Sequence, residues 1–267
     1  MKNYITMAVA CLAVAGLFTA CSKSEETISG TGSLNIEFEN GYKGNLLVLG
    51  ATNLPTSANE VLTVNKVKYI VSNIVLTKED GTVFTYPKAD SYFIVDQTNP
   101  ESLVLNLSNI PAANYKSIQF GIGVDQAQYE LGQSGIADFW AQAQAAGMTW
   151  SWASGFKFLA FEGTFTSPTV SSATSYMIHT GKFGADYNYT TVNLDLPTQA
   201  LVRTTITPQI HLSTDLSQII DGTNKVNLSN NNGMGMGAMI MGGPLLPQIT
   251  ANLSDMFDVE HVHNDPN

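Results

Sequence analysis

The sequence predicts a mainly β protein, an antiparallel β-sandwich of the immunoglobulin-like or a related kind with short helical insertions. Three observations support this fold class. Apolar and polar residues alternate with a period of two along many short segments. Gly, Asn, Asp and Pro bound nearly all of these segments, as expected of strands joined by turns. Hydrophobic residues make up 44% of the chain and charged residues only 13%, a balance that favours a folded core over disorder.

The first strands can be placed from local patterns. Leu34, Ile36 and Phe38 alternate with polar neighbours, so one face of this segment should be buried. Residues 66–77 are β-branched and aromatic, and they lead through Asp80-Gly81 into residues 82–86, which predicts a hairpin. Further strands are expected at residues 92–95, 103–107, 118–124, 156–161, 175–179, 192–196 and 204–212.

Helical signals are few. Residues 134–146 begin at a serine suited to an N-cap and continue with good helix formers. Residues 214–220 and 254–257 could each form a turn or two. No internal repeat is evident and no linker interrupts residues 32–267, so we expect a single domain there.

The first residues predict an export signal. Lys2 is followed by an apolar run at residues 5–18, shorter than the roughly 20 residues that span a membrane. Phe18-Thr19-Ala20-Cys21 resembles the lipobox of bacterial lipoproteins, in which the chain is cut before a cysteine that carries lipid. The resemblance implies that residues 1–20 are removed and that Cys21 anchors the protein in the cell envelope, at the outer membrane. A plain signal peptide that leaves a free cysteine is the alternative.

The segment after the expected cleavage point is small and polar, so residues 21–31 are interpreted as a flexible tether. Cys11 belongs to the part that would be removed. The mature chain would then keep one cysteine, and a structural disulfide would be excluded.

Charge and motifs exclude several functions. The chain has 12 Lys and Arg against 22 Asp and Glu, a net charge of −10 that would repel nucleic acid. It contains no nucleophile elbow, zinc-protease motif, P-loop or dinucleotide fingerprint. We therefore expect neither a nucleic-acid partner nor an enzyme.

Four segments, in order, resemble the MbnP-like family of copper-associated envelope proteins. Residues 147–163 (GMTWSWASGFKFLAFEG) are similar to the family core M-x-W-x-W-x-x-G-[YF]-x-F, which runs into an acidic residue and a glycine. Residues 68–81, 110–125 and 178–181 look like three further family segments. The resemblance implies a β protein whose partner or cofactor is a copper ion.

Related proteins hold copper with two histidines and a ligand made by oxidising a tryptophan. Trp140, Trp150 and Trp152 all lack a histidine two residues later, so that ligand cannot be assigned here. His179, in the segment similar to the family's F-H-x-G strand, is one copper candidate, because a neutral imidazole binds copper well. A hydrogen-bonded structural histidine at a strand end is the alternative.

His261 and His263 form the second candidate. Alternate residues of an extended segment share a face, so both imidazoles could reach one ion, with His179 as a third partner. A solvated polar tail is the alternative. His211 lies opposite Ile210 and Leu212 and is interpreted as a solvent-facing or hydrogen-bonded strand residue rather than a ligand.

The third candidate is a glycine-rich stretch, residues 230–243, that contains Met234 and Met236. Thioethers are soft ligands that select Cu(I), although methionines also fill gaps in ordinary loops.

The sequence also permits a function without metal. The alternative is a carbohydrate- or peptide-binding or adhesion lipoprotein, in which aromatic rings form a platform for the ligand. The rings that would form it belong to Trp150, Trp152, Tyr187 and Tyr189.

Overall fold

The computed structural model describes residues 28–51, 54–150 and 155–267. Cys21 and Trp152 lie outside these ranges. The strands are β1 (Thr31–Tyr42), β2 (Asn45–Leu46), β3 (Leu54–Pro55), β4 (Val61–Lys78), β5 (Val83–Thr85), β6 (Tyr92–Asp96), β7 (Val104–Pro111), β8 (Ala113–Ile122), β9 (Lys157–Thr166), β10 (Thr174–Phe183), β11 (Asp186–Tyr187), β12 (Thr190–Val202), β13 (Gln209–Asp215), β14 (Ala238–Ile240) and β15 (Phe257–His263). The α-helices are α1 (Gln126–Glu130), α2 (Ala137–Ala145), α3 (Gln218–Asp221) and α4 (Leu245–Leu253).

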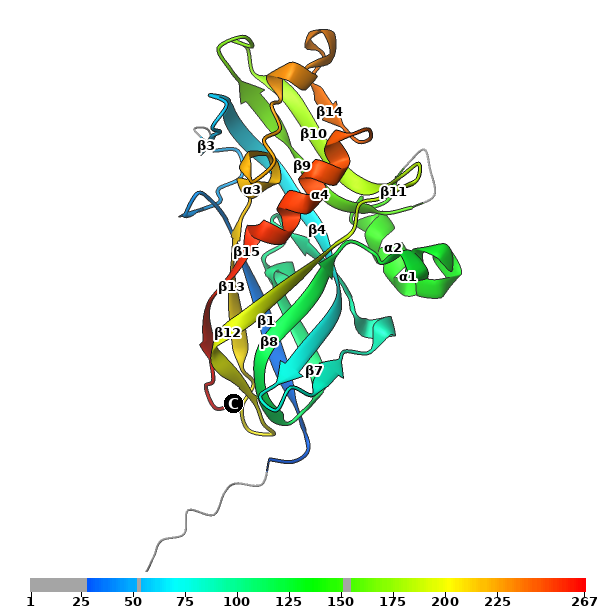
Figure 1. Cartoon of the computed structure of the whole chain (residues 1–267), viewed down its shortest axis with the longest axis vertical. Coiled ribbons are helices and arrows are strands. Elements are labelled where there is room, and N and C mark those ends of the chain that lie inside the picture. Colours follow the sequence, from blue (N-terminus) through cyan, green and yellow to red (C-terminus); the bar gives the residue numbers. More distant parts are fainter. Residues whose placement is uncertain (1–27, 52–53, 151–154) are drawn as a thin grey trace, which may run out of the picture.

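The strands form two sheets. The smaller sheet has the order β15-β13-β1-β2, and β7 also pairs with β1. The larger has the order β11-β10-β9-β4-β8-β12, with β3, β5 and β6 on β4 and β14 on β10. All pairs between these strands are antiparallel except β1–β13 and β10–β14. The expected mainly β, sandwich-like fold is confirmed (Figure 1).

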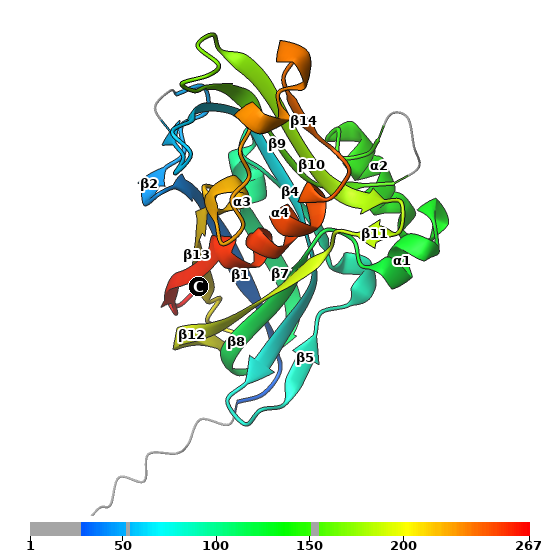
Figure 2. The ribbon, with the colours of Figure 1, turned by 45° about the horizontal axis from the view of Figure 1, so that its top comes forward.

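The long strand β4 ties the two ends of the larger sheet together. Its first half pairs with β9 and its second half with β8. Pairing with β8 is irregular between Ser72 and Val75, where Asn73 has a positive φ of 54°. Asparagine tolerates this left-handed conformation better than most residues, so the strand can bend here. β9 and β10 therefore lie toward one end of the elongated molecule and β8 and β12 toward the other (Figures 1 and 2).

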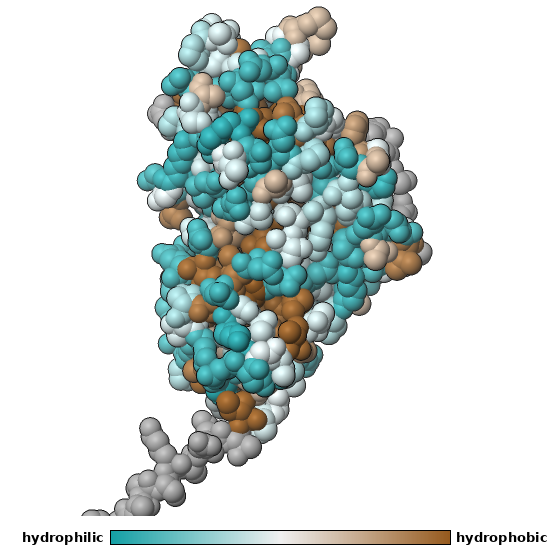
Figure 3. Space-filling model, in the orientation of Figure 1, coloured by the Kyte–Doolittle hydropathy of each residue, from teal (hydrophilic) through white to brown (hydrophobic). Residues whose placement is uncertain are grey.

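The core lies between the sheets and follows the predicted alternation. Leu34, Ile36 and Phe38 of β1 are each at most 1% exposed. Phe38 makes edge-to-face contacts with Tyr69 and with Phe257 of the last strand. A second apolar cluster lies beneath α1 and α2, which cover one side of the larger sheet. The surface in Figure 3 is mostly hydrophilic, and its apolar area gathers over the half that contains β8 and β12.

The helices differ in part from the expectation. α2 lies inside residues 134–146, as predicted, but α3 is shorter than residues 214–220 because β13 continues to Asp215. The expected strand at residues 204–212 begins only at Gln209, after Pro208. α4 was not predicted; Pro247 stands in its first turn, where proline is tolerated. Among the described residues, no helix combines the length and the apolar character needed to cross a membrane.

Candidate metal centre

Strands β13 and β15 bring three imidazoles together. The two strands are antiparallel, and their register places His211 opposite His261 and Gln209 opposite His263. One ring nitrogen from each of His211, His261 and His263 lies within 4.8 Å of the other two. We call these residues the three-histidine centre.

A β-bulge in β15 sets the direction of these histidines. Leu212 pairs with Val259, but His211 pairs with His261, so Glu260 is an extra residue. Val259 and Val262 both pack against the core although they are three residues apart. A regular strand would turn only residues two apart to the same face. The extra residue therefore keeps both valines inside and turns both histidines outward, as bulges next to functional sites often do.

The rings of the centre are in direct contact. The Nε2 atoms of His261 and His263 lie 3.0 Å apart, so one donates a hydrogen bond and the other accepts it. The rings of His211 and His261 are stacked, with centroids 4.2 Å apart and an angle of 18° between their planes. The lone pair of an imidazole nitrogen lies in the plane of its ring, so the lone pairs of two stacked rings run side by side and do not meet at one point. Either His211 or His261 must therefore turn before all three histidines can bind the same ion.

Two carboxylates of β1 orient His211. Its Nδ1 lies 3.2 Å from Glu37 Oε2 and 3.3 Å from Glu39 Oε1. Its Nε2 lies 3.1 Å from the amide nitrogen of Gln209, which can only donate. Nε2 is therefore the acceptor, and Nδ1–H donates to the carboxylates. A carboxylate behind a histidine in this way is the usual second layer of a metal site, because it fixes the ring and makes the free nitrogen more basic.

The centre is open to solvent on the β15 side. The side chain of His211 is 12% exposed, while those of His261 and His263 are 42% and 53% exposed. A metal ion could therefore reach the centre from solution without any opening of the core. The same exposure gives the outer two rings room to turn.

An acidic groove adjoins the centre along the smaller sheet. Glu39 borders both the centre and the groove, so the two are continuous. The groove is lined by Glu39, Gly41, Gly44, Asn45, Leu46, Ser213, Thr214, Asp215, Asp258 and Glu260. Four of these side chains are carboxylates, so the groove carries negative potential toward the imidazoles.

His179 does not join the centre, which corrects the expectation that it is the third partner of His261 and His263. It lies on β10 of the larger sheet, and its Nε2 is 2.9 Å from Glu162 Oε1. Its Nδ1 is buried and has no hydrogen-bond partner among the described residues. The ring of Trp150 lies 5.7 Å from that of His179. His179 thus lies on the strand that resembles the family's F-H-x-G segment. It belongs to neither group of three potential metal ligands among the described residues.

Glu162 links His179 to a lysine. Its second carboxylate oxygen lies 2.9 Å from Lys66 Nζ. The hydrogen bond from His179, aided by Lys66, outweighs burial and lowers the pKa of Glu162 from 4.5 to about 2. One imidazole in an ion-paired network is a structural arrangement more than a metal site.

The methionines are also apart from the centre. Met234 and Met236 lie in the loop before β14, a strand that pairs with β10 of the larger sheet. They are 94% and 74% exposed. In Figure 1 this loop lies at the top of the molecule, whereas β15 descends through the lower half. The loop that carries these thioethers therefore does not lie beside His261 and His263.

The three aromatic residues of the alternative function that the structure describes, Trp150, Tyr187 and Tyr189, do not form an open platform. Trp150 is 9% exposed and packs beside His179. The hydroxyl of Tyr187 donates to the Val124 carbonyl, and that of Tyr189 accepts from Asn73. Both tyrosine rings pack against the apolar cluster beneath α1 and α2. Trp152 lies outside the described residues.

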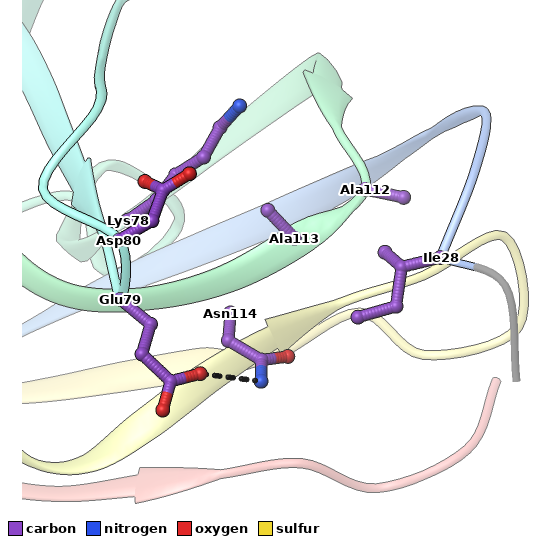
Figure 4. A pocket seen from close by; sticks show the side chains of 7 residues that line it. All are labelled: Ile28, Lys78, Glu79, Asp80, Ala112, Ala113 and Asn114. Carbon is purple, nitrogen blue, oxygen red and sulfur yellow. Dashed lines mark hydrogen bonds between the residues drawn. The ribbon is translucent and has the colours of Figure 1, made fainter. Parts of the chain in front are cut away.

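A separate shallow pocket lies beside the turn after β4 and the start of β8. Glu79 and Asn114 are joined there by a hydrogen bond of 3.3 Å, while Lys78 and Asp80 point away from Glu79 (Figure 4). Ile28, Ala112 and Ala113 supply the rest of its lining. Alanines and paired polar groups offer no set of ligands, so this pocket carries no candidate chemistry.

Sequence reasoning missed His211. Its alternation with Ile210 and Leu212 correctly indicated an outward-facing residue. What gathers on that face depends on the pairing of β13 with β1 in parallel and with β15, across 172 and about 50 residues of sequence. The sequence offers one signal: polar residues alternate with apolar ones in both strands, Glu37 and Glu39 in β1 and Gln209 and His211 in β13. This alternation indicates that each strand has a polar outer face.

Comparison with known proteins gives one family. The MbnP family model matches residues 31–240, more than half of the chain. That match includes His211 and His179 but ends before His261 and His263. A solved structure, MbnP from Methylosinus trichosporium, aligns with 80% of this chain and 82% of its own, at 14% identity and a TM-score of 0.48. No curated protein matches.

Proposed function

The chain belongs to the MbnP family, and from that membership we propose that it is a copper-binding protein of the bacterial cell envelope. Its role in this proposal is to take up, hold or hand on copper, and it is a binding protein rather than an enzyme. Lipid on Cys21 would anchor it to the outer membrane.

The observation that carries the proposal is the three-histidine centre. Three imidazoles with ring nitrogens within 4.8 Å of one another form a donor set that suits copper. His211 already has its Nε2 free of a proton, because Nδ1–H is directed to Glu37 and Glu39. An ion could take the place of the proton shared by His261 and His263.

The first test is copper uptake. The full chain is expected to bind one equivalent of copper, and H211A/H261A/H263A is expected to bind it at least about 100-fold more weakly, since it lacks every ligand of the centre. Equilibrium dialysis at pH 7.4 with copper analysis of both compartments measures this. Each added copper should also displace protons, which calorimetry in buffers of different ionisation enthalpy detects.

Two matched variants locate the site. H179A removes one imidazole on the larger sheet, and M234A/M236A removes the exposed thioethers. Both are expected to keep the uptake of the unmutated chain. Full copper uptake by H211A/H261A/H263A would contradict the proposal.

A further inference from the structure

We infer that the three-histidine centre takes copper as Cu(II) and discriminates against Cu(I). This inference rests on the proposed function and adds the charge state of the ion. Three features of the structure support it: the donor atoms at the centre, the charge around it and the position of the sulfur ligands.

The donors nearest the centre are nitrogen and oxygen. The three imidazoles supply the nitrogens. Carboxylate oxygens lie beside two of them: Asp265 Oδ2 is 3.7 Å from His263 Nδ1, and Glu260 Oε2 is 4.0 Å from His261 Nδ1. Imidazole and carboxylate together suit tetragonal Cu(II), which among divalent first-row ions binds such sites most tightly. The open side of β15 leaves room for solvent to complete the coordination.

The surroundings carry an excess of negative charge. Glu37 and Glu39 lie behind His211, and the acidic groove adds Asp258 and Glu260. None of these four carboxylates forms an ion pair with a lysine or arginine within the described ranges. A fixed field favours a dication over a monocation by twice the interaction energy, because Coulomb energy is proportional to charge. The groove also raises the local concentration of cations and their rate of arrival.

Soft ligands are placed elsewhere. The thioethers of Met234 and Met236, which would select Cu(I), lie on the loop before β14 in the other sheet. Met256, the methionine nearest to β15 in sequence, is 2% exposed and packed in the core. Within the part of the chain that the structure describes, the centre therefore has no methionine sulfur to favour the reduced ion.

The test compares three ions on the full chain. Copper(II) sulfate, zinc sulfate and, without oxygen, a Cu(I) acetonitrile complex are each titrated against a chelator of known affinity. H211A/H261A/H263A is expected to lose at least about 100-fold in Cu(II) affinity and less than about 3-fold in Cu(I) affinity. Cu(II) is expected to bind at least about 10-fold more tightly than Zn(II). The Cu(II) complex should show nitrogen hyperfine coupling in its electron paramagnetic resonance spectrum.

A charge variant separates the field from the ligands. E37Q/E39Q/D258N/E260Q keeps all three imidazoles, and it is expected to weaken Cu(II) binding about 10- to 100-fold and Cu(I) binding by a smaller factor. Its Cu(II) on-rate should also lose part of its dependence on ionic strength.

The outcomes distinguish the two proposals. A triple-histidine variant that loses more affinity for Cu(I) than for Cu(II) would overturn this inference but leave copper binding at the centre intact. Tighter binding of Zn(II) than of Cu(II) would also overturn it. Unchanged affinity for both copper ions in that variant would refute the proposed function itself.

Discussion

At the scale of the residue, this protein places two histidines beside carboxylates with different consequences. His179 is buried with Glu162, and the pair is completed by Lys66. His211 faces Glu37 and Glu39 at the edge of a groove, next to two exposed imidazoles. A contact between a histidine and a carboxylate thus has two uses here. It belongs to a buried ion-pair network at His179, and it suits a metal ion at His211, where two further imidazoles lie nearby.

Glu162 should make stability depend on pH in the acidic range. Its pKa is 4.5 in an unperturbed chain and about 2 in the folded protein. The stabilisation is therefore fully present above pH 4.5 and is lost as the pH falls toward 2. E162Q should lower the urea midpoint at pH 7, and its deficit relative to the unmutated chain should shrink between pH 4.5 and 2.

A control for this experiment is E101Q, because Glu101 is exposed at the start of a surface turn. This variant should follow the unmutated chain at each pH. A deficit for E162Q that stays constant down to pH 2 would show that the carboxylate charge is not the cause.

At the scale of the element, β15 joins the candidate centre to the core. Its first residue, Phe257, is 3% exposed and makes edge-to-face contacts with Phe38, Tyr69 and Phe120. The strand lies beyond the part of the chain that the family model matches, but it is integral to the packing.

We expect F257A to lower the free energy of unfolding by about 3–5 kcal/mol, because it opens a cavity among three aromatic rings. F257L keeps most of the apolar volume and should cost less than about 1.5 kcal/mol. Urea unfolding followed by tryptophan fluorescence measures both. If F257A unfolds at the midpoint of the unmutated chain, β15 is not packed as described.

Local patterns were enough for most strands but not for their partners. The hairpin of β4 and β5, the buried face of β1 and the helix α2 follow from alternation, turn residues and helix formers. The helix α4 was not predicted; it carries Pro247 in its first turn, a position where proline is tolerated. The strand expected to end at residue 212 continues to Asp215, and residues 257–263 form a strand that was not predicted. Both differences follow from the pairing of β13 with β15, which local patterns do not reveal.

At the scale of the whole molecule, the fold separates hard donors from soft ones. Imidazoles and carboxylates gather on the smaller sheet, and the exposed thioethers lie on a loop of the larger sheet. The sequence shows His261, His263, Met234 and Met236 within 30 residues of one another, but α4 and the change of sheet between β14 and β15 carry them apart. Sequence proximity could not reveal this, because it depends on which sheet each strand joins.

The proposed anchor is also a property of the whole molecule. β1 begins at Thr31, toward the lower end of the molecule in Figure 1, so nine residues of sequence separate Cys21 from the smaller sheet. The methionine loop lies at the opposite end.

We expect the full chain, expressed in a host that processes lipoproteins, to enter the detergent phase in Triton X-114 partitioning. C21A should move to the aqueous phase, since each acyl methylene contributes about 0.8 kcal/mol to membrane binding. C11A, which changes the part to be removed, is the matched control and should partition with the unmutated chain. Detergent-phase recovery of C21A would refute the lipid anchor.

The extra residue Glu260 also bears on how sequences related to this one are interpreted. A relative could keep all three histidines and still lack the cluster, if the strand that matches Phe257–His263 had the same number of residues but alternated regularly, without the bulge. In that chain the two terminal imidazoles would point into the hydrophobic interior and a valine would take their place outside. The face on which each histidine lies in the paired strand, and not the number of ligands, is what a search for such sites should score.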